Sequence, residues 1–157
     1  MEKSFEKNMA RTVLAILPQI DKYCDGIAKS NIARAIGSFD GMRNTEAVME
    51  KIIDKTYQIQ QLHNLQVKAQ RVLDAVPKKY AEVFNMMFIQ KMTAVDIAKV
   101  MDICERSVFR LLSQGLEWFA DNLMPVFGFN AFRSIMAANQ WVQGVFQEIS
   151  HERGNAA

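Results

Sequence analysis

The chain has 157 residues, of which 50% are hydrophobic and 23% are charged, so it can bury a core and is not disordered by composition. Seven Gly and three Pro are too few for an all-β fold, which places these residues in most of its hairpins. The formal net charge is +2, and residues 44–157 balance to zero, so there is no strongly basic field that would demand an acidic partner. The composition predicts an all-α protein.

The residues that usually carry chemistry are isolated from one another. Cys24 and Cys104 have no CxxC spacing, and His63 and His151 have no ligand-spaced neighbours, so we expect neither a zinc site nor a disulfide, and no cofactor. The sequence contains no P-loop, HExxH or Ser-His-Asp pattern, and we expect that it is not an enzyme. Without a signal peptide or a run of about 18 apolar residues, it is expected to be cytoplasmic and not membrane-bound.

Residues 1–43 are expected to form two N-terminal helices. Apolar residues recur at helical spacing from Phe5 to Leu17, and Pro18 should end or kink that helix because it lacks an N–H donor. A second, short helix should stop near Gly37, followed by a loop at residues 37–41. Its apolar positions are Ile20, Tyr23, Ile27, Ile32 and Ile36.

Residues 44–76 contain no Gly or Pro and predict one long connecting helix, with Asn44 or Thr45 as its N-cap. About 30 residues would span about 45 Å, which is too long for a compact core element. One face carries a stripe of apolar residues, Val48, Ile52, Ile59, Leu62, Ala69, Val72 and Val76. Two interpretations of this stripe remain open. It could be a core face or one side of a helical hairpin within one chain, or it could be the seam between two chains.

Residues 77–123 predict a three-helix unit, which begins with Pro77 at the first helical position. Thr93 and Asp96 form a near capping box for a short helix over 94–100. A turn at 101–104 leads to a helix over 105–123. Residues 124–157 predict one amphipathic helix from about Asn130, followed by a tail.

Two short helices joined by a tight turn describe a helix-turn-helix. Ala98 is small where the two helices must approach, and apolar residues stand where the helices meet. Residues at the start of the second helix would face outwards and enter the major groove of DNA, and these are Glu105, Arg106, Ser107, Phe109 and Arg110. Arg106 and Arg110 share a helix face, and Arg is the commonest reader of guanine. The competing interpretation treats them as solvated or ion-paired surface charges.

The stretch 76–123 resembles region 4 of bacterial sigma factors, and resembles still more closely the phage late-gene regulators of the ArpU and RinA type. The resemblance rests on two motifs, TAVDIA at residues 93–98 and ERSVFRL at residues 105–111. It implies a C-terminal helix-turn-helix unit in a helical bundle with a long central helix. Lys91 and Asp102 stand where glycine is usual, and Cys104 replaces a capping Ser or Thr. We therefore expect a first turn that is looser or differently shaped, and a weaker cap on the second helix.

The leading hypothesis is a sequence-specific, DNA-binding transcriptional regulator of phage or prophage type, which could also contact RNA polymerase. Its base-reading helix would start at Glu105. Side chains that contact phosphates and set orientation would be Lys78, Lys79, Lys91, Thr93 and Lys99. The alternative is a protein-interaction adaptor, such as a co-sigma, anti-sigma or polymerase-binding factor, which the neutral charge of 77–123 favours.

A homodimer is also expected, because one neutral helix-turn-helix buries little surface on DNA. The apolar stripe of 48–76 and a second stripe at 129–149 would supply the interface. The competing account covers both stripes within one chain, by the N-terminal helices and the C-terminal helix. The operator, the sign of regulation and the regulated genes do not follow from these residues.

Overall fold

The computed structural model describes residues 2–39 and 45–156, and within these ranges the chain is helical and contains no β-strand. The α-helices are α1 (Glu2–Ile16), α2 (Ile20–Phe39), α3 (Thr45–Asp74), α4 (Lys78–Phe84), α5 (Ala94–Met101), α6 (Glu105–Leu123), α7 (Phe129–Ala138) and α8 (Gln140–Ala156). A 3-10 segment, η1 (Leu17–Gln19), precedes α2, and a π-helical turn, η2 (Asn85–Ile89), follows α4. The expected all-α bundle with a long central helix and a helix-turn-helix is confirmed.

The first bend of the chain lies at Pro18, within η1, as its missing N–H donor predicts. Beyond it, α2 continues to Phe39, so the expected helix end near Gly37 is wrong, and Gly37 and Ser38 are helical. A Gly costs a helix only about 1 kcal/mol relative to Ala, which the pairing of α2 with α3 can offset. The rest of the expected loop and the candidate cap Asn44 lie outside the described residues.

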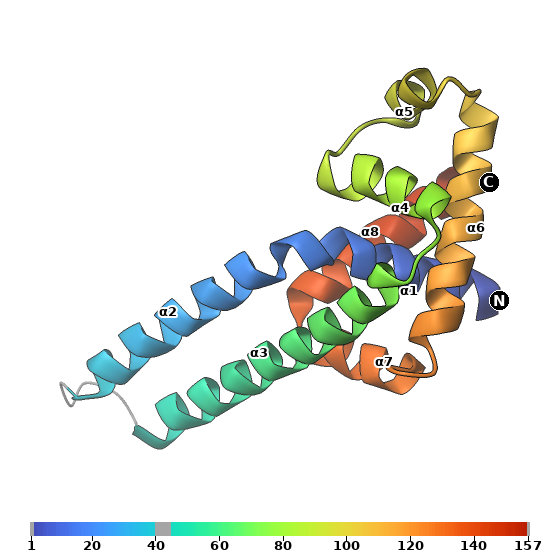
Figure 1. The fold of residues 1–157 in the computed structure, drawn as a ribbon. Helices are drawn as coiled ribbons and strands as arrows, with labels where there is room; N and C mark the ends of the chain where they lie inside the picture. Colours follow the sequence, from blue (N-terminus) through green and yellow to red (C-terminus); the bar gives the residue numbers. More distant parts are fainter. Residues whose placement is uncertain (1, 40–44, 157) are drawn as a thin grey trace.

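α2 and α3 form a long antiparallel hairpin that projects from the body of the molecule (Figure 1). The Gln66 amide donates to Asp21 Oδ1 over 3.0 Å, and Asn31 Nδ2 lies 3.5 Å from Thr56 Oγ1. The residues of α3 that become buried are Val48, Leu62, Leu65, Ala69 and Val72. The predicted stripe is thus covered largely inside the chain, and the hairpin interpretation is confirmed.

The core surrounds α1, which packs against both α6 and α8. Its residues Met9, Ala10 and Val13 are almost fully buried. Near the N-terminus the Phe5 ring lies 5.3 Å from that of Phe129 and 5.4 Å from that of Phe146, centroid to centroid. These contacts bind α1, α7 and α8 together, so the stripe expected at 129–149 is also used within the chain.

The C-terminal segment is two helices rather than the one expected, because the chain breaks at Asn139. The buried Asn139 accepts a hydrogen bond from the Val142 N–H through its Oδ1 at 3.2 Å, which caps α8. Helical backbone continues through Ala156, where a tail was expected.

The start of α4 also differs from the expectation, because Pro77 is the N-cap of this helix instead of its first helical residue. No helix in the described ranges is long and apolar enough to cross a membrane.

Candidate nucleic-acid interface

The interface is built on α6, whose C-terminal half is held by the body of the protein. Leu112, Leu116 and Phe119 are buried in the main core. Gly115 lets α4 approach, since a Cβ at this position would lie 2.8 Å from Phe84 Cζ and 3.2 Å from Tyr80 Cβ. This contact was not predicted from the sequence, although a Gly inside a strongly periodic helix was a signal for it. The anchored half fixes the direction in which the other half of α6 projects.

The link from α4 to α5 passes through the π-helical turn η2, in which the Gln90 N–H donates to the Asn85 carbonyl five residues earlier. Lys91 then adopts φ +55°, the left-handed conformation that glycine favours. The Met92 N–H donates to the Met86 carbonyl over 2.9 Å, so the turn is closed by a hydrogen bond with Lys in the place of glycine. Thr93 Oγ1 accepts from the Asp96 N–H at 3.2 Å and caps α5, as predicted.

The turn between α5 and α6 is also closed by backbone hydrogen bonds. Asp102 has φ +56°, and the Ile103 N–H donates to the Ala98 carbonyl over 3.0 Å, the pattern of a Schellman motif. The apolar Ile103 packs back on a small core of Ile97, Ala98 and Val108. Ala98 is 8% exposed and lies where the two helices meet, as the sequence predicted.

A group of methionines surrounds this small core, which is separate from the main one. Its partly buried neighbours include Met86, Met87, Met92 and Met101. Methionine side chains are flexible and fill irregular gaps. The helix-turn-helix therefore has its own packing and joins the body mainly through α4 and α6.

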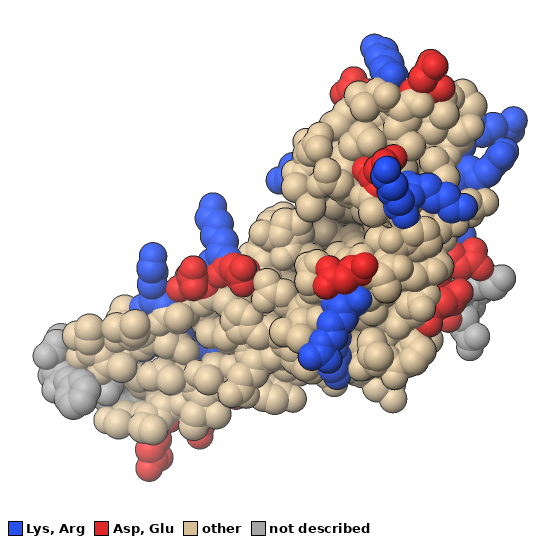
Figure 2. All heavy atoms as spheres, viewed as in Figure 1, with Lys and Arg blue, Asp and Glu red and all other residues tan. Residues whose placement is uncertain are grey.

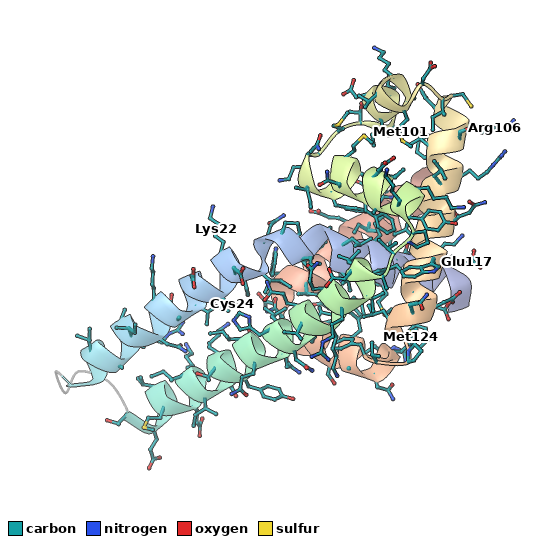
Figure 3. All side chains as sticks on the ribbon, viewed as in Figure 1. Lys22, Cys24, Met101, Arg106, Glu117 and Met124 are labelled. Atoms are coloured by element: carbon teal, nitrogen blue, oxygen red, sulfur yellow. The ribbon has the colours of Figure 1, made fainter. Side chains whose placement is uncertain are left out.

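The first turns of α6 extend beyond this packing. Glu105, Arg106, Phe109 and Arg110 are all exposed, and Phe109 keeps 55% of its surface accessible. Arg106 lies at the N-terminal end of α6 and points away from the body, whereas Glu117 lies further along the helix (Figure 3). Among the described residues, no carboxylate pairs with Arg106 or Arg110. Their guanidinium groups therefore remain available to a ligand.

Ser107 is partly buried, and its hydroxyl lies 3.2 Å from Cys104 Sγ. Hydrogen bonds from Ser107 lower the pKa of the Cys104 thiol, which occupies the N-cap position of α6. A weaker cap on α6 was expected from this cysteine, and the Cys104 side chain makes no cap hydrogen bond. The N-terminus of α6 keeps its first turn through the Ser107 and Val108 N–H groups, which both donate to the Cys104 carbonyl.

The five predicted phosphate contacts come from two parts of the fold. Lys91, Thr93 and Lys99 belong to α5 and its preceding turn, whereas Lys78 and Lys79 begin α4, and all five are exposed. Lys79 lies over the Tyr80 ring, with Nζ 4.9 Å from its centroid. Figure 2 shows Lys and Arg side chains spread around this end of the molecule, with Asp and Glu among them.

Two exposed apolar residues of α5 were absent from the sequence-based site. Val95 is 44% exposed and Val100 is 66% exposed. The helical period could have predicted their exposure, since neither residue lies on the same side of the helix as the buried Ile97 and Ala98. In the part of the chain that the structure describes, no group of three or more His, Cys, Asp or Glu residues could hold a metal ion.

Comparison with known protein families matches residues 66–119 to the family described as sigma-70, region 4. This range runs from the last turns of α3 through α4, η2 and α5 into α6. Residues 66–119 form a sigma-70 region 4-like helix-turn-helix. The family is a DNA-binding module of the transcription apparatus and not an enzyme. The match spans about a third of the chain, and comparisons with curated proteins and with solved structures found no match.

Proposed function

We propose that this protein is a sequence-specific DNA-binding transcriptional regulator of phage or prophage type, with the start of α6 in the major groove. The observation that carries the proposal is the exposure of Arg106 and Arg110, one turn apart and without a carboxylate partner in the described chain, at the start of the second helix of the motif. This is where helix-turn-helix proteins contact base edges. A guanidinium fork matches the two acceptors of guanine.

The remaining predicted side chains would orient the protein on the DNA backbone. Lys91 precedes α5 and Lys99 lies in its last turn, and α5 is the helix that crosses the DNA backbone in this motif. Thr93 uses its hydroxyl oxygen to cap α5, so its hydroxyl hydrogen remains free to donate to a phosphate. Lys78 and Lys79 would contact phosphates beside α4. Glu105 and Ser107 would contact bases or help to position the arginines.

A second candidate function is a protein-interaction adaptor that binds RNA polymerase or another transcription protein. On α5 and α6, three large apolar side chains are exposed, namely Val95, Val100 and Phe109. The six basic and six acidic residues of 77–123 also cancel, which weakens attraction to phosphates. Phe109 fits either function, because it could touch a thymine methyl group or a protein partner.

We further propose that the regulator acts as a homodimer. Two copies related by a two-fold axis would place two recognition helices about 34 Å apart, one turn of DNA, on a near-palindromic target. Because both stripes that first suggested the dimer are largely used inside the chain, its interface must be sought elsewhere on the surface.

The decisive experiment selects bound sequences from a pool of random duplex DNA and then measures affinity for the enriched sequence. Specific binding predicts an enriched motif and an affinity that falls linearly with salt on logarithmic axes. The adaptor predicts no enrichment and no retention on heparin or on nonspecific duplex at about 50 mM salt. An absence of both enrichment and retention would overturn the DNA-binding proposal.

A further inference from the structure

Five large apolar side chains are more than half exposed on the outer part of the α2–α3 hairpin. They are Ile32 (61%) and Ile36 (60%) on α2, and Met49 (54%), Ile53 (60%) and Tyr57 (57%) on α3. We refer to this set as the hairpin patch. Ile32 and Ile36 were expected on the apolar, inward face of their helix, and this prediction is wrong because both side chains are exposed. A contiguous group of this size on a surface usually marks an interaction site.

Four members of the patch, Ile32 and Ile36 on α2 and Met49 and Ile53 on α3, face the same side of the hairpin. Ile32 and Ile36 directly follow the half-buried Asn31 and Ala35, just as Met49 and Ile53 follow Val48 and Ile52, which lie toward α2. One residue turns a helix by about 100°. Because α2 and α3 run in opposite directions, the same step from the inward position takes both sets of side chains to one side.

The members also interleave along the hairpin axis. The hydrogen bonds that join residue 21 to 66 and residue 31 to 56 fix the register of the two helices. In this register Ile36 is level with residue 51, and Ile32 is level with residue 55. The order along the axis is therefore Met49, Ile36, Ile53, Ile32, Tyr57, with successive members about 3 Å apart. Along the axis, the members of the patch therefore alternate between the two helices.

We infer that the hairpin patch binds a second copy of this chain, with the two hairpins side by side and pointing in the same direction. A two-fold axis parallel to the hairpins brings α2 of one copy opposite α3 of the other at the same level. Alternating members then meet, so that each side chain enters the gap between two members on the other copy. The interface is isologous, which is the usual form for a homodimer.

The exposed area favours a second copy as the occupant. Five large side chains, each more than half exposed, offer several hundred Å² per copy, and two copies approach the roughly 1,200 Å² at which stable interfaces begin. The direction rests on the proposed function, because the helix-turn-helix lies at the end of the molecule away from the hairpin tip (Figure 1). Opposed hairpins would separate the recognition helices by far more than one turn of DNA.

The test of the interface is the molar mass of the full chain by light scattering, measured without DNA. We expect a mass near 36 kDa, twice the 17.9 kDa of one chain, at micromolar concentration. Ile53→Glu should give a mass near that of one chain with unchanged helical content, because its side chain is mostly exposed. The matched control is Val67→Glu, also on α3 and 52% exposed, but 14 residues or about 21 Å from Ile53.

A wild-type mass of one chain would overturn the inference, as would an unchanged dimer in both Ile53→Glu and Ile36→Glu. Loss of the dimer in Val67→Glu but not in Ile53→Glu would place the interface elsewhere. These outcomes do not depend on DNA binding, so a failure of the proposed function would appear separately, in the selection experiment.

The direction is tested by oxidative cross-linking in a Cys24→Ala, Cys104→Ser background. When differently tagged Ile32→Cys and Ile53→Cys chains are mixed, the parallel arrangement predicts a mixed cross-linked dimer. Opposed hairpins would bring α3 against α3, so Ile53→Cys chains would cross-link with themselves and the mixed product would be absent. That result would overturn the parallel arrangement.

Discussion

The two cysteines lie in opposite environments, although neither belongs to a metal or disulfide motif. Cys24 lies on α2 and is buried in the main core, and burial, with the nearby Asp21 and Asp25, raises the pKa of its thiol. Cys104 is exposed at the start of α6, where hydrogen bonds from Ser107 lower the pKa of its thiol. The reactive form of a thiol is the thiolate, so these shifts affect reactivity in opposite directions.

Iodoacetamide should therefore label Cys104 and spare Cys24 in the folded protein, and mass spectrometry of the peptides measures both. Because the pKa of Cys104 is lowered, its thiolate forms at lower pH, and its labelling rate should rise at lower pH than that of a free cysteine. Both residues should react in denaturant, which is the control. Saturating target DNA should slow the labelling of Cys104, since α6 then lies in the groove. Equal labelling of the two cysteines in the folded protein would contradict these environments.

Among the helices, the contact between α4 and α6 helps to fix the direction in which the start of the recognition helix projects. It depends on Gly115, which lies against Phe84 and Tyr80. The Phe84 ring has little room to move, because it is 5% exposed and packs edge-on against Phe119 with centroids 6.5 Å apart. A side chain at position 115 would separate the two helices or displace the ring.

We expect Gly115→Ala to lower the free energy of unfolding by up to about 2 kcal/mol, because overpacking costs about 1–3 kcal/mol and the gain in helix propensity returns only about 1 kcal/mol. Gly144→Ala is the matched control, since a Cβ there meets nothing within 4 Å. That variant should be more stable than wild type by up to about 1 kcal/mol. Urea unfolding measures both, and equal gains in the two variants would show that α4 and α6 are not in close contact at Gly115.

For the whole molecule, local sequence signals predicted where most helices lie, whereas tertiary contacts decided some helix boundaries and which face of each helix is buried. Thr93 and the ERSVFRL motif located α5 and α6 correctly, because caps and periodicity act within a few residues. The break at Asn139 was missed because this side chain caps α8 and also contacts Tyr23, over 3.4 Å, from a distant part of the chain. Periodicity indicated that α3 has an apolar face, but only the structure shows that α2 covers it.

The surface was predicted less well than the core. Ile32 and Ile36 fit a helical apolar pattern, yet they face outwards, because the pairing of α2 with α3 rather than the period selects the buried side. Conversely, Arg106 and Arg110 were expected to be exposed and are exposed. The DNA contacts proposed for them follow from their place in the motif and remain predictions.

The central claim is that Arg106 and Arg110 read bases, and its most direct test is the affinity of alanine variants for the selected duplex. Arg106→Ala and Arg110→Ala should each weaken binding by about 1–3 kcal/mol, with a much smaller loss on nonspecific DNA. Arg71→Ala, an exposed arginine in the last turn of α3, should bind like wild type. If both α6 variants bind the selected duplex as tightly as wild type, the account of this helix as the base-reading element is contradicted.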